Sequence, residues 1–140
     1  MTKKETKRNV EQESIDVLIC EDDPFILESI EHTVGMEGFK FRSTESGKEA
    51  LDIARRLKPK VILLDLMLPD ISGLEVCRHI KGRPETREMT VLIITARGQD
   101  ADIQEGLTAG ADEYITKPYS PRALCKKLHA LLDGLEETGK

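Results

Sequence analysis

Val61-Ile62-Leu63-Leu64-Asp65 is the stretch of sequence that decides the fold. Four consecutive apolar residues predict a strand that is buried on both faces, as in a parallel sheet covered by helices. The run ends in an aspartate, and open α/β sheets assemble their sites at the carboxyl ends of strands. Asp65 is therefore the first candidate for a functional residue.

Polar residues follow three more predicted strands at the corresponding position. These strands and the residues behind them are Val17–Cys20 with Glu21 and Asp22, Val91–Ile94 with Thr95, and Tyr114-Ile115 with Lys117. Each residue alone has an ordinary structural explanation: an acid can cap a helix, a threonine favours a strand, and a lysine is usually a solvated surface charge. Because the carboxyl ends of parallel strands share one edge of a sheet, their joint placement favours a site instead.

Helical patterns alternate with the strands. They begin at Asp23-Pro24, at the capping box formed by Ser46 and Glu49, near Leu74, near residue 100 and at Ser120-Pro121, and a further strand is expected at Phe39–Arg42. Five strands alternating with five helices predict an α/β fold with a doubly wound parallel sheet. We expect a flexible tail over residues 1–14, one domain over 15–135 and a short tail over 136–140.

Composition narrows the function classes. A chain of 140 residues is long enough for one well-packed domain, and its net charge of −5 argues against broad nucleic-acid binding. No apolar run has the ~20 residues of a membrane helix. The odd number of cysteines (Cys20, Cys77 and Cys125) shows no metal-ligand spacing, which favours reduced thiols in a cytoplasmic protein.

Four segments together resemble the receiver domain of two-component response regulators. They are Cys20–Pro24, Leu64–Gly73, Ile94–Ala96 and Gly110–Pro118, and the resemblance extends from about Ile15 to Leu132. It implies a flavodoxin-like sheet with strand order 2-1-3-4-5.

The resemblance assigns Asp65 as a phospho-acceptor, supplied by a phosphohistidine on a sensor histidine kinase or a histidine phosphotransfer protein. A bare carboxylate reacts poorly with an anionic phosphoryl group, and Mg²⁺ or Mn²⁺ would screen that repulsion. By resemblance the metal ligands are Asp22, Asp65 and the backbone carbonyl of Met67, with Glu21 acting through water. Without metal these acids should repel one another, so at least one pKa should rise.

Three residues complete the implied site. Lys117 pairs with Asp65 at rest and with the phosphoryl oxygens afterwards, and Thr95 donates its hydroxyl to the same oxygens. Tyr114 matches the aromatic residue that moves when Thr95 is drawn towards the phosphoryl group, and the Lys117-Pro118 bond matches one that is usually cis. Met67 and Arg97 stand where the family varies and tunes phosphoryl lifetime; an apolar Met67 predicts a long-lived phosphorylated state.

The implied protein is a cytoplasmic signalling switch, not an enzyme. Its partners would be the phosphoryl donor and either a downstream protein or an effector domain absent from this chain, with no direct nucleic acid and no membrane. A phosphorylation-dependent dimer is compatible with the resemblance. Whether the chain is a stand-alone regulator or was cut from a longer protein stays open, because only Glu136–Lys140 follow the predicted domain.

Three rival functions fit less well. A phosphatase of the haloacid dehalogenase type needs a second acid where Met67 stands. A flavin-binding domain needs a phosphate loop where Glu21 and Asp22 would repel the ligand. A degenerate receiver kept as a scaffold would not need Asp22, Asp65, Thr95 and Lys117 together.

Overall fold

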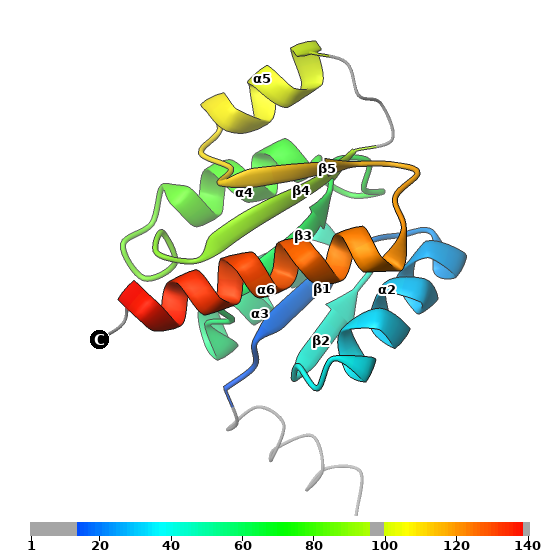
Figure 1. Ribbon diagram of the computed structural model, residues 1–140. Helices are drawn as coiled ribbons and strands as arrows, with labels where there is room; N and C mark the ends of the chain where they lie inside the picture. The colour runs from blue at the N-terminus through cyan, green and yellow to red at the C-terminus, as the bar shows by residue number, and fades with distance from the viewer. Residues whose placement is uncertain (1–13, 96–99, 139–140) are drawn as a thin grey trace, which may run out of the picture.

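The computed structural model describes residues 14–95 and 100–138, and Figure 1 shows one sheet between two layers of helices. In chain order the elements are β1 (Val17–Cys20), α2 (Pro24–Met36), β2 (Phe41–Thr44), α3 (Gly47–Leu57), β3 (Val61–Asp65), α4 (Gly73–Lys81), β4 (Thr90–Thr95), α5 (Asp100–Thr108), β5 (Glu113–Thr116) and α6 (Pro121–Thr138). The five strands are parallel in the order β2-β1-β3-β4-β5. The predicted fold class and strand order are confirmed.

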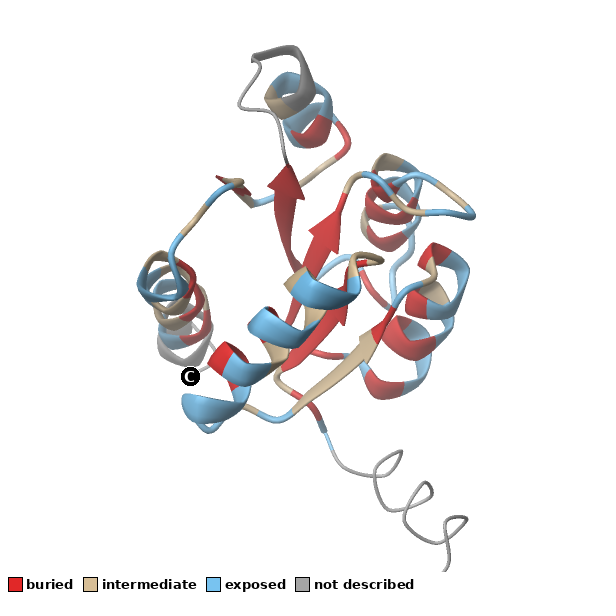
Figure 2. Ribbon diagram, turned by 90° about the vertical axis from the view of Figure 1, so that its right-hand side faces the viewer, coloured by how far each residue is buried: buried red, intermediate tan, exposed pale blue. Residues whose placement is uncertain are grey.

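The sheet separates two apolar cores. On one face α2 and α6 bury Ile30, Leu124 and Leu128 against β1, β3 and β4. On the other face α3 and α4 bury Ile53 and Ile80, and α5 lies near the edge formed by β4 and β5. Figure 2 shows the consequence, with buried residues along the sheet and on the sheet-facing sides of the helices. β3 and β4 are buried along their whole length, as predicted for central parallel strands.

The starts of two helices follow the predicted caps. The Asp23 carboxylate accepts hydrogen bonds from the backbone N–H groups of Phe25 (2.9 Å) and Ile26 (3.2 Å), with proline at the first helical position. Ser46 accepts from the Glu49 N–H at 3.1 Å. The Ser46 N–H donates to Thr44 Oγ1 at 3.1 Å, so threonine takes the part that a capping box gives to glutamate.

Two boundaries differ from the prediction. β2 covers 41–44 rather than 39–42, because its ladder with β1 begins where Phe41 pairs with Val17; Phe39 still packs into the core on the α2 side. α6 continues to Thr138, three residues beyond the expected boundary at 135, over Glu136 and Glu137, which favour helix. The tail expected over residues 1–14 lies almost wholly outside the described residues.

A close approach of the chain fixes the loop after β3. The Gly73 N–H donates to the Leu66 carbonyl at 3.0 Å, which brings the start of α4 against the end of β3. A Cβ at Gly73 would collide with the Asp65 carbonyl oxygen, so this approach requires glycine. The loop between Asp65 and α4 is therefore held close to the carboxyl edge of the sheet.

Candidate functional site

Three carboxylates meet at the carboxyl edge of the sheet. Asp65 is the last residue of β3, and Glu21 and Asp22 follow the last residue of the neighbouring β1. Each of these side chains has a carboxylate oxygen within 4.8 Å of the other two. Glu21 and Asp65 are buried and Asp22 is half-buried, so the group opens to solvent on the Asp22 side.

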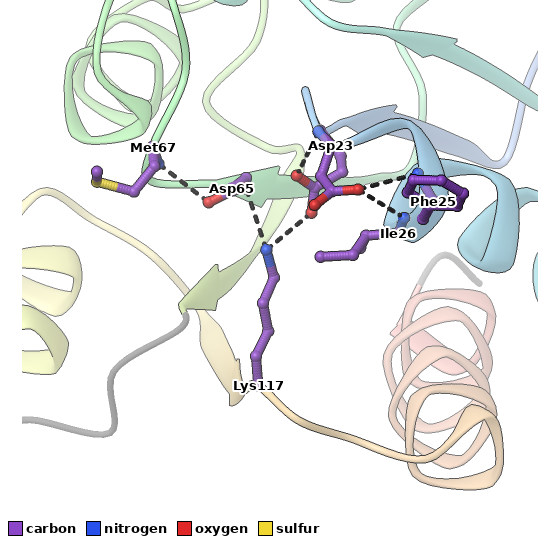
Figure 3. Close-up of polar contacts among 7 residues, drawn as sticks. Asp23, Phe25, Ile26, Asp65, Met67 and Lys117 are labelled. Atoms are coloured by element: carbon purple, nitrogen blue, oxygen red, sulfur yellow. Dashed lines mark hydrogen bonds and ion pairs between the residues drawn. The ribbon is translucent and has the colours of Figure 1, made fainter.

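Lys117 supplies a cation to this group. It follows β5 directly, and its Nζ lies 3.0 Å from Glu21 Oε1 and 3.2 Å from Asp65 Oδ2. Figure 3 shows the Lys117 side chain reaching from the end of β5 towards Asp65. The side chain is 17% exposed, and the Lys117-Pro118 bond is cis, as predicted. Glu21, Asp22, Asp65 and Lys117 are called the acidic edge below.

Backbone groups hold the acids in place. The Met67 N–H donates to Asp65 Oδ1 at 3.0 Å, and the Asp23 N–H donates to Glu21 Oε2 at 3.2 Å (Figure 3). The Met67 side chain points away into solvent and is 73% exposed. One oxygen of Asp65 is thus oriented by the loop and the other by Lys117.

Burial and charge shift the pKa values of two groups. Burial, together with the neighbouring Asp65, raises the pKa of Glu21 to about 7, and the ion pair with Lys117 offsets part of that rise. Burial lowers the pKa of Lys117, but its pairing with Glu21 and Asp65 outweighs burial and raises it overall. The predicted rise of a carboxyl pKa is therefore found, although desolvation contributes more than the repulsion that the sequence suggested.

Thr95 lies at the same carboxyl edge, and Tyr114 lies two residues deeper in the sheet, on β5 opposite Ile93. Thr95 is the last residue of β4 and lies next to Asp65, because Asp65 pairs with Ile94 in the β3–β4 register. The Thr95 carbonyl accepts a hydrogen bond from the Lys117 N–H at 2.7 Å. Thr95 is buried and Tyr114 half-buried, and both line a small cavity of about 10 Å³ under α5. That volume is no more than a single water occupies, so any movement of Thr95 must be matched by the groups around this cavity. Arg97 lies outside the described residues.

The acidic edge fits a divalent cation. All three side-chain donors are carboxylates, the ligands that Mg²⁺ and Mn²⁺ prefer. Glu21 Oε1 is buried and, among the described residues, accepts no hydrogen bond of normal geometry, although Lys117 lies at ion-pair distance. Three acids facing one lysine leave an excess of negative charge that a cation would neutralise. The Met67 carbonyl stays a predicted fourth ligand.

One residue with a positioning role was not singled out by the sequence. Asp70, in the loop between β3 and α4, accepts hydrogen bonds from the N–H groups of Gly47 (2.9 Å) and Lys48 (3.0 Å) and from Ser46 Oγ (2.7 Å). These donors hold the pKa of Asp70 well below its usual range. This arrangement, called the Asp70 cap below, ties the loop that follows the phospho-acceptor candidate to the first turn of α3.

Comparison with known proteins shows the family of the chain. Residues 17–129 match the family model of the response regulator receiver domain. The chain is 38% identical over 125 residues to the probable transcriptional regulatory protein TcrX of Mycobacterium tuberculosis, covering 89% of this chain and 53% of that protein. It is 40% identical over 116 residues to the transcriptional regulatory protein CreB of Escherichia coli, covering 83% and 50%. The chain therefore spans about half the length of these curated relatives.

Solved structures agree with the sequence relatives. A CheY-like response regulator receiver domain protein from Methanospirillum hungatei superimposes with a TM-score of 0.81 at 31% identity, covering 90% of this chain and 99% of that one. The receiver domain of the Pseudomonas aeruginosa sensor histidine kinase PA1611 has a TM-score of 0.80 at 26% identity, covering 86% and 99%, and contains a magnesium ion in its active site cleft. No helix within the described ranges is both long and apolar enough to cross a membrane.

Proposed function

Because the chain belongs to the family of response regulator receiver domains, we propose that it switches between two states when Asp65 accepts a phosphoryl group. The observation that carries this assignment is the ion pair of Lys117 with Asp65 at the end of β3, beside the carboxylates of Glu21 and Asp22. Phosphorylation and magnesium binding are general features of the family.

The proposed reaction is a phosphoryl transfer. A carboxylate oxygen of Asp65 forms a bond to phosphorus while the phosphorus–nitrogen bond of a phosphohistidine breaks. The electron pair of the broken bond returns to the imidazole, which takes up a proton. Asp65 then carries an acyl phosphate, and attack of water on phosphorus later returns the carboxylate and inorganic phosphate.

The acids of the acidic edge would hold the metal, and Lys117 would pair with the phosphoryl group. Asp22 and Asp65 would hold Mg²⁺ or Mn²⁺ with the Met67 carbonyl, and Glu21 would act through a water molecule. When bound, the metal neutralises charge on the phosphoryl oxygens. Lys117 transfers its ion pair from the carboxylate to the phosphoryl group, and the hydroxyl of Thr95 donates to the same group.

The output of the switch is proposed to pass through Thr95 and Tyr114. Support comes from the small cavity that both side chains line beneath α5, where little free volume is available. Displacement of Thr95 towards Asp65 would open space that the ring of Tyr114 can enter. The surface formed by α5, β5 and α6 would then change shape, as a two-state equilibrium biased by phosphorylation.

The partners of this switch follow from its chemistry. We propose a sensor histidine kinase or a histidine phosphotransfer protein as donor, acting in the cytoplasm. Relatives such as CreB are named transcriptional regulators and are about twice as long as the matched region, which supports an effector domain or a downstream protein as the recipient. The net charge of −5 argues against direct nucleic-acid contact by this domain.

Incubation with acetyl phosphate and Mg²⁺ tests the function. The intact mass should rise by one phosphoryl group, and the rise should disappear in Asp65→Asn and in the presence of a chelator. Asp52→Asn is the matched control, since it removes an exposed aspartate of α3 that lies outside both the acidic edge and the Asp70 cap. A folded wild-type protein that gains no mass from acetyl phosphate or from a phosphorylated donor protein would overturn the proposal.

A further inference from the structure

A groove runs between α3 and α4 on the outside of the molecule. The two helices pack side by side on one face of the sheet, and two clefts between and beside them adjoin at His79 and Arg83. The first cleft has a volume of about 160 Å³ and a floor of Leu51, Ala54 and Ile80. It contains no residue of the acidic edge, so the proposed phosphoryl chemistry does not explain it.

The rim of the groove is cationic in an acidic protein. Lys48, Arg55, His79 and Arg83 line the first cleft, and no acidic residue does. Arg78 adds a further cation in the adjoining cleft, where Glu75 pairs with it at 3.2 Å. The whole chain carries a net charge of −5, so this concentration of positive charge is local.

The cations of the rim are available to a partner. Arg55 lies 3.8 Å from Asp52 and Arg83 lies 4.0 Å from Glu85, and all four side chains are about half exposed (45% to 52%). Such surface pairs are weak and exchange readily for better ones. Among the described residues, Lys48 and His79 have no side-chain ion pair.

The apolar floor limits what can bind. A cavity of ~150 Å³ holds a benzene ring, so the cleft has room for one leucine or phenylalanine side chain. No phenylalanine, tyrosine or tryptophan lines either cleft, so His79 is the one ring there on which a nucleobase could stack. The net negative charge also repels long polyanions at a distance.

We propose that the groove between α3 and α4 binds an acidic segment of a partner protein. One apolar side chain of the segment occupies the cleft over Leu51 and Ile80, and flanking carboxylates pair with Arg55 and Arg83. The interaction surface is distinct from the α5–β5–α6 surface that responds to phosphorylation. It gives the domain a second contact surface.

A titration of the full-length chain with a synthetic peptide tests this inference. The peptide carries one leucine flanked on both sides by acidic residues, and binding is followed by amide chemical shifts and fluorescence anisotropy. We expect shifts in α3 and α4 around Leu51, Arg55 and His79. The double variant Arg55→Glu/Arg83→Glu should weaken binding by about tenfold or more. The neutral pair Arg55→Gln/Arg83→Gln should weaken it less.

The matched control is Arg122→Glu/Lys126→Glu, which changes the net charge equally on exposed positions of α6. Peptide binding should be unchanged in this variant, and exchanging the peptide leucine for serine should weaken binding to the wild type. Equal weakening by both charge reversals, or shifts outside α3, α4 and the segment 82–86 that follows α4, would overturn the proposal. So would no binding, tighter binding of a single-stranded oligonucleotide, or concentration-dependent shifts of the protein alone that place a second copy in the groove.

Discussion

At the acidic edge, Glu21, Asp22 and Asp65 place carboxylate oxygens within 4.8 Å of one another, whereas in the Asp70 cap a single carboxylate faces hydrogen-bond donors. The two regions are joined by the short loop after β3, yet the pKa values of their carboxyl groups are shifted in opposite directions. The pKa of Glu21 is raised to about 7 by burial, and that of Asp70 is held below its usual range by its donors. The clustered carboxylates of the acidic edge therefore lower the stability of the fold, whereas the hydrogen-bonded carboxylate of Asp70 raises it.

The largest test of the comparison removes the cation of the acidic edge. Lys117→Met should lower the rate of phosphorylation by acetyl phosphate about 100-fold or more, because Lys117 no longer neutralises the charge on Asp65 and the phosphoryl oxygens. The rate is measured by intact mass over time. Lys126→Met, on the exposed surface of α6, is the matched control and should react at the wild-type rate. Equal rates for both variants would remove Lys117 from the site.

Binding of Mg²⁺ at the acidic edge should raise the free energy of unfolding, because the metal neutralises the clustered carboxylates. At a Mg²⁺ concentration ~100-fold above its Kd, mass action adds about 2.7 kcal/mol to the free energy of unfolding. Urea unfolding with and without MgCl₂ at matched ionic strength measures this gain. Asp22→Asn should lose most of it and Asp70→Asn should keep it. A gain that Asp70→Asn abolishes and Asp22→Asn retains would place the metal elsewhere.

The raised pKa of Glu21 should make the acidic edge less stabilising as the pH rises. Between the ordinary pKa of 4.5 and about 7, folded metal-free protein keeps a proton on Glu21 that the unfolded chain has released. Its contribution to stability is therefore present at low pH and is lost as the pH rises through this window. Comparison of wild type and Glu21→Gln in chelator at about pH 5 and about pH 8 should show a smaller loss in the variant. An identical pH dependence would contradict the shift.

Asp70 should show the opposite dependence in a lower window. Its folded pKa lies below the ordinary 3.8, so its contribution to stability is present above 3.8 and is lost as the pH falls from there through the lower folded pKa. Asp70→Asn should melt at a lower temperature than wild type at neutral pH, and the difference should narrow in acid. A constant difference across this range would mean that the carboxylate charge does not stabilise the start of α3.

The smallest effect is expected at the junction of the two regions. Met67 follows Asp65 in the connecting loop, and its exposed apolar side chain cannot orient a water towards the phosphoryl group. Met67→Asn should therefore accelerate loss of phosphate from Asp65, measured as the decay of the phosphoprotein mass after the donor is removed. Unchanged or slower decay would sink this explanation of phosphoryl lifetime. Met36→Asn, at another exposed methionine on α2, controls for the substitution itself.

Most residues of the acidic edge were predictable because apolar runs in the sequence mark where the strands end. Asp65 closes an uninterrupted apolar run, and Lys117 follows a short strand, so parallel pairing alone brings both to one edge. The roles assigned to these residues came from the family resemblance and remain proposals. The cause of the Glu21 shift was partly missed, because burial depends on how helices and loops cover the site.

The Asp70 cap and the cationic groove were not predictable in the same way. Asp70 accepts from donors more than twenty residues away in the sequence, so no local pattern announces the contact. The rim of the groove combines residues of α3, α4 and the turn after α4, whose alignment only the packed structure defines. The two-residue displacement of β2 has a related origin, since its ladder is fixed by the partner strand β1 and not by its own alternation.

The central claim, that Asp65 is the phospho-acceptor, is tested most directly by locating the modification. Borohydride reduces an aspartyl phosphate to homoserine, which marks the modified residue permanently. After treatment with acetyl phosphate, Mg²⁺ and borohydride, the tryptic peptide covering residues 61–78 should contain homoserine at position 65 alone. Homoserine at Asp70 or in the peptide that contains Asp22, with position 65 unmodified, would contradict the claim.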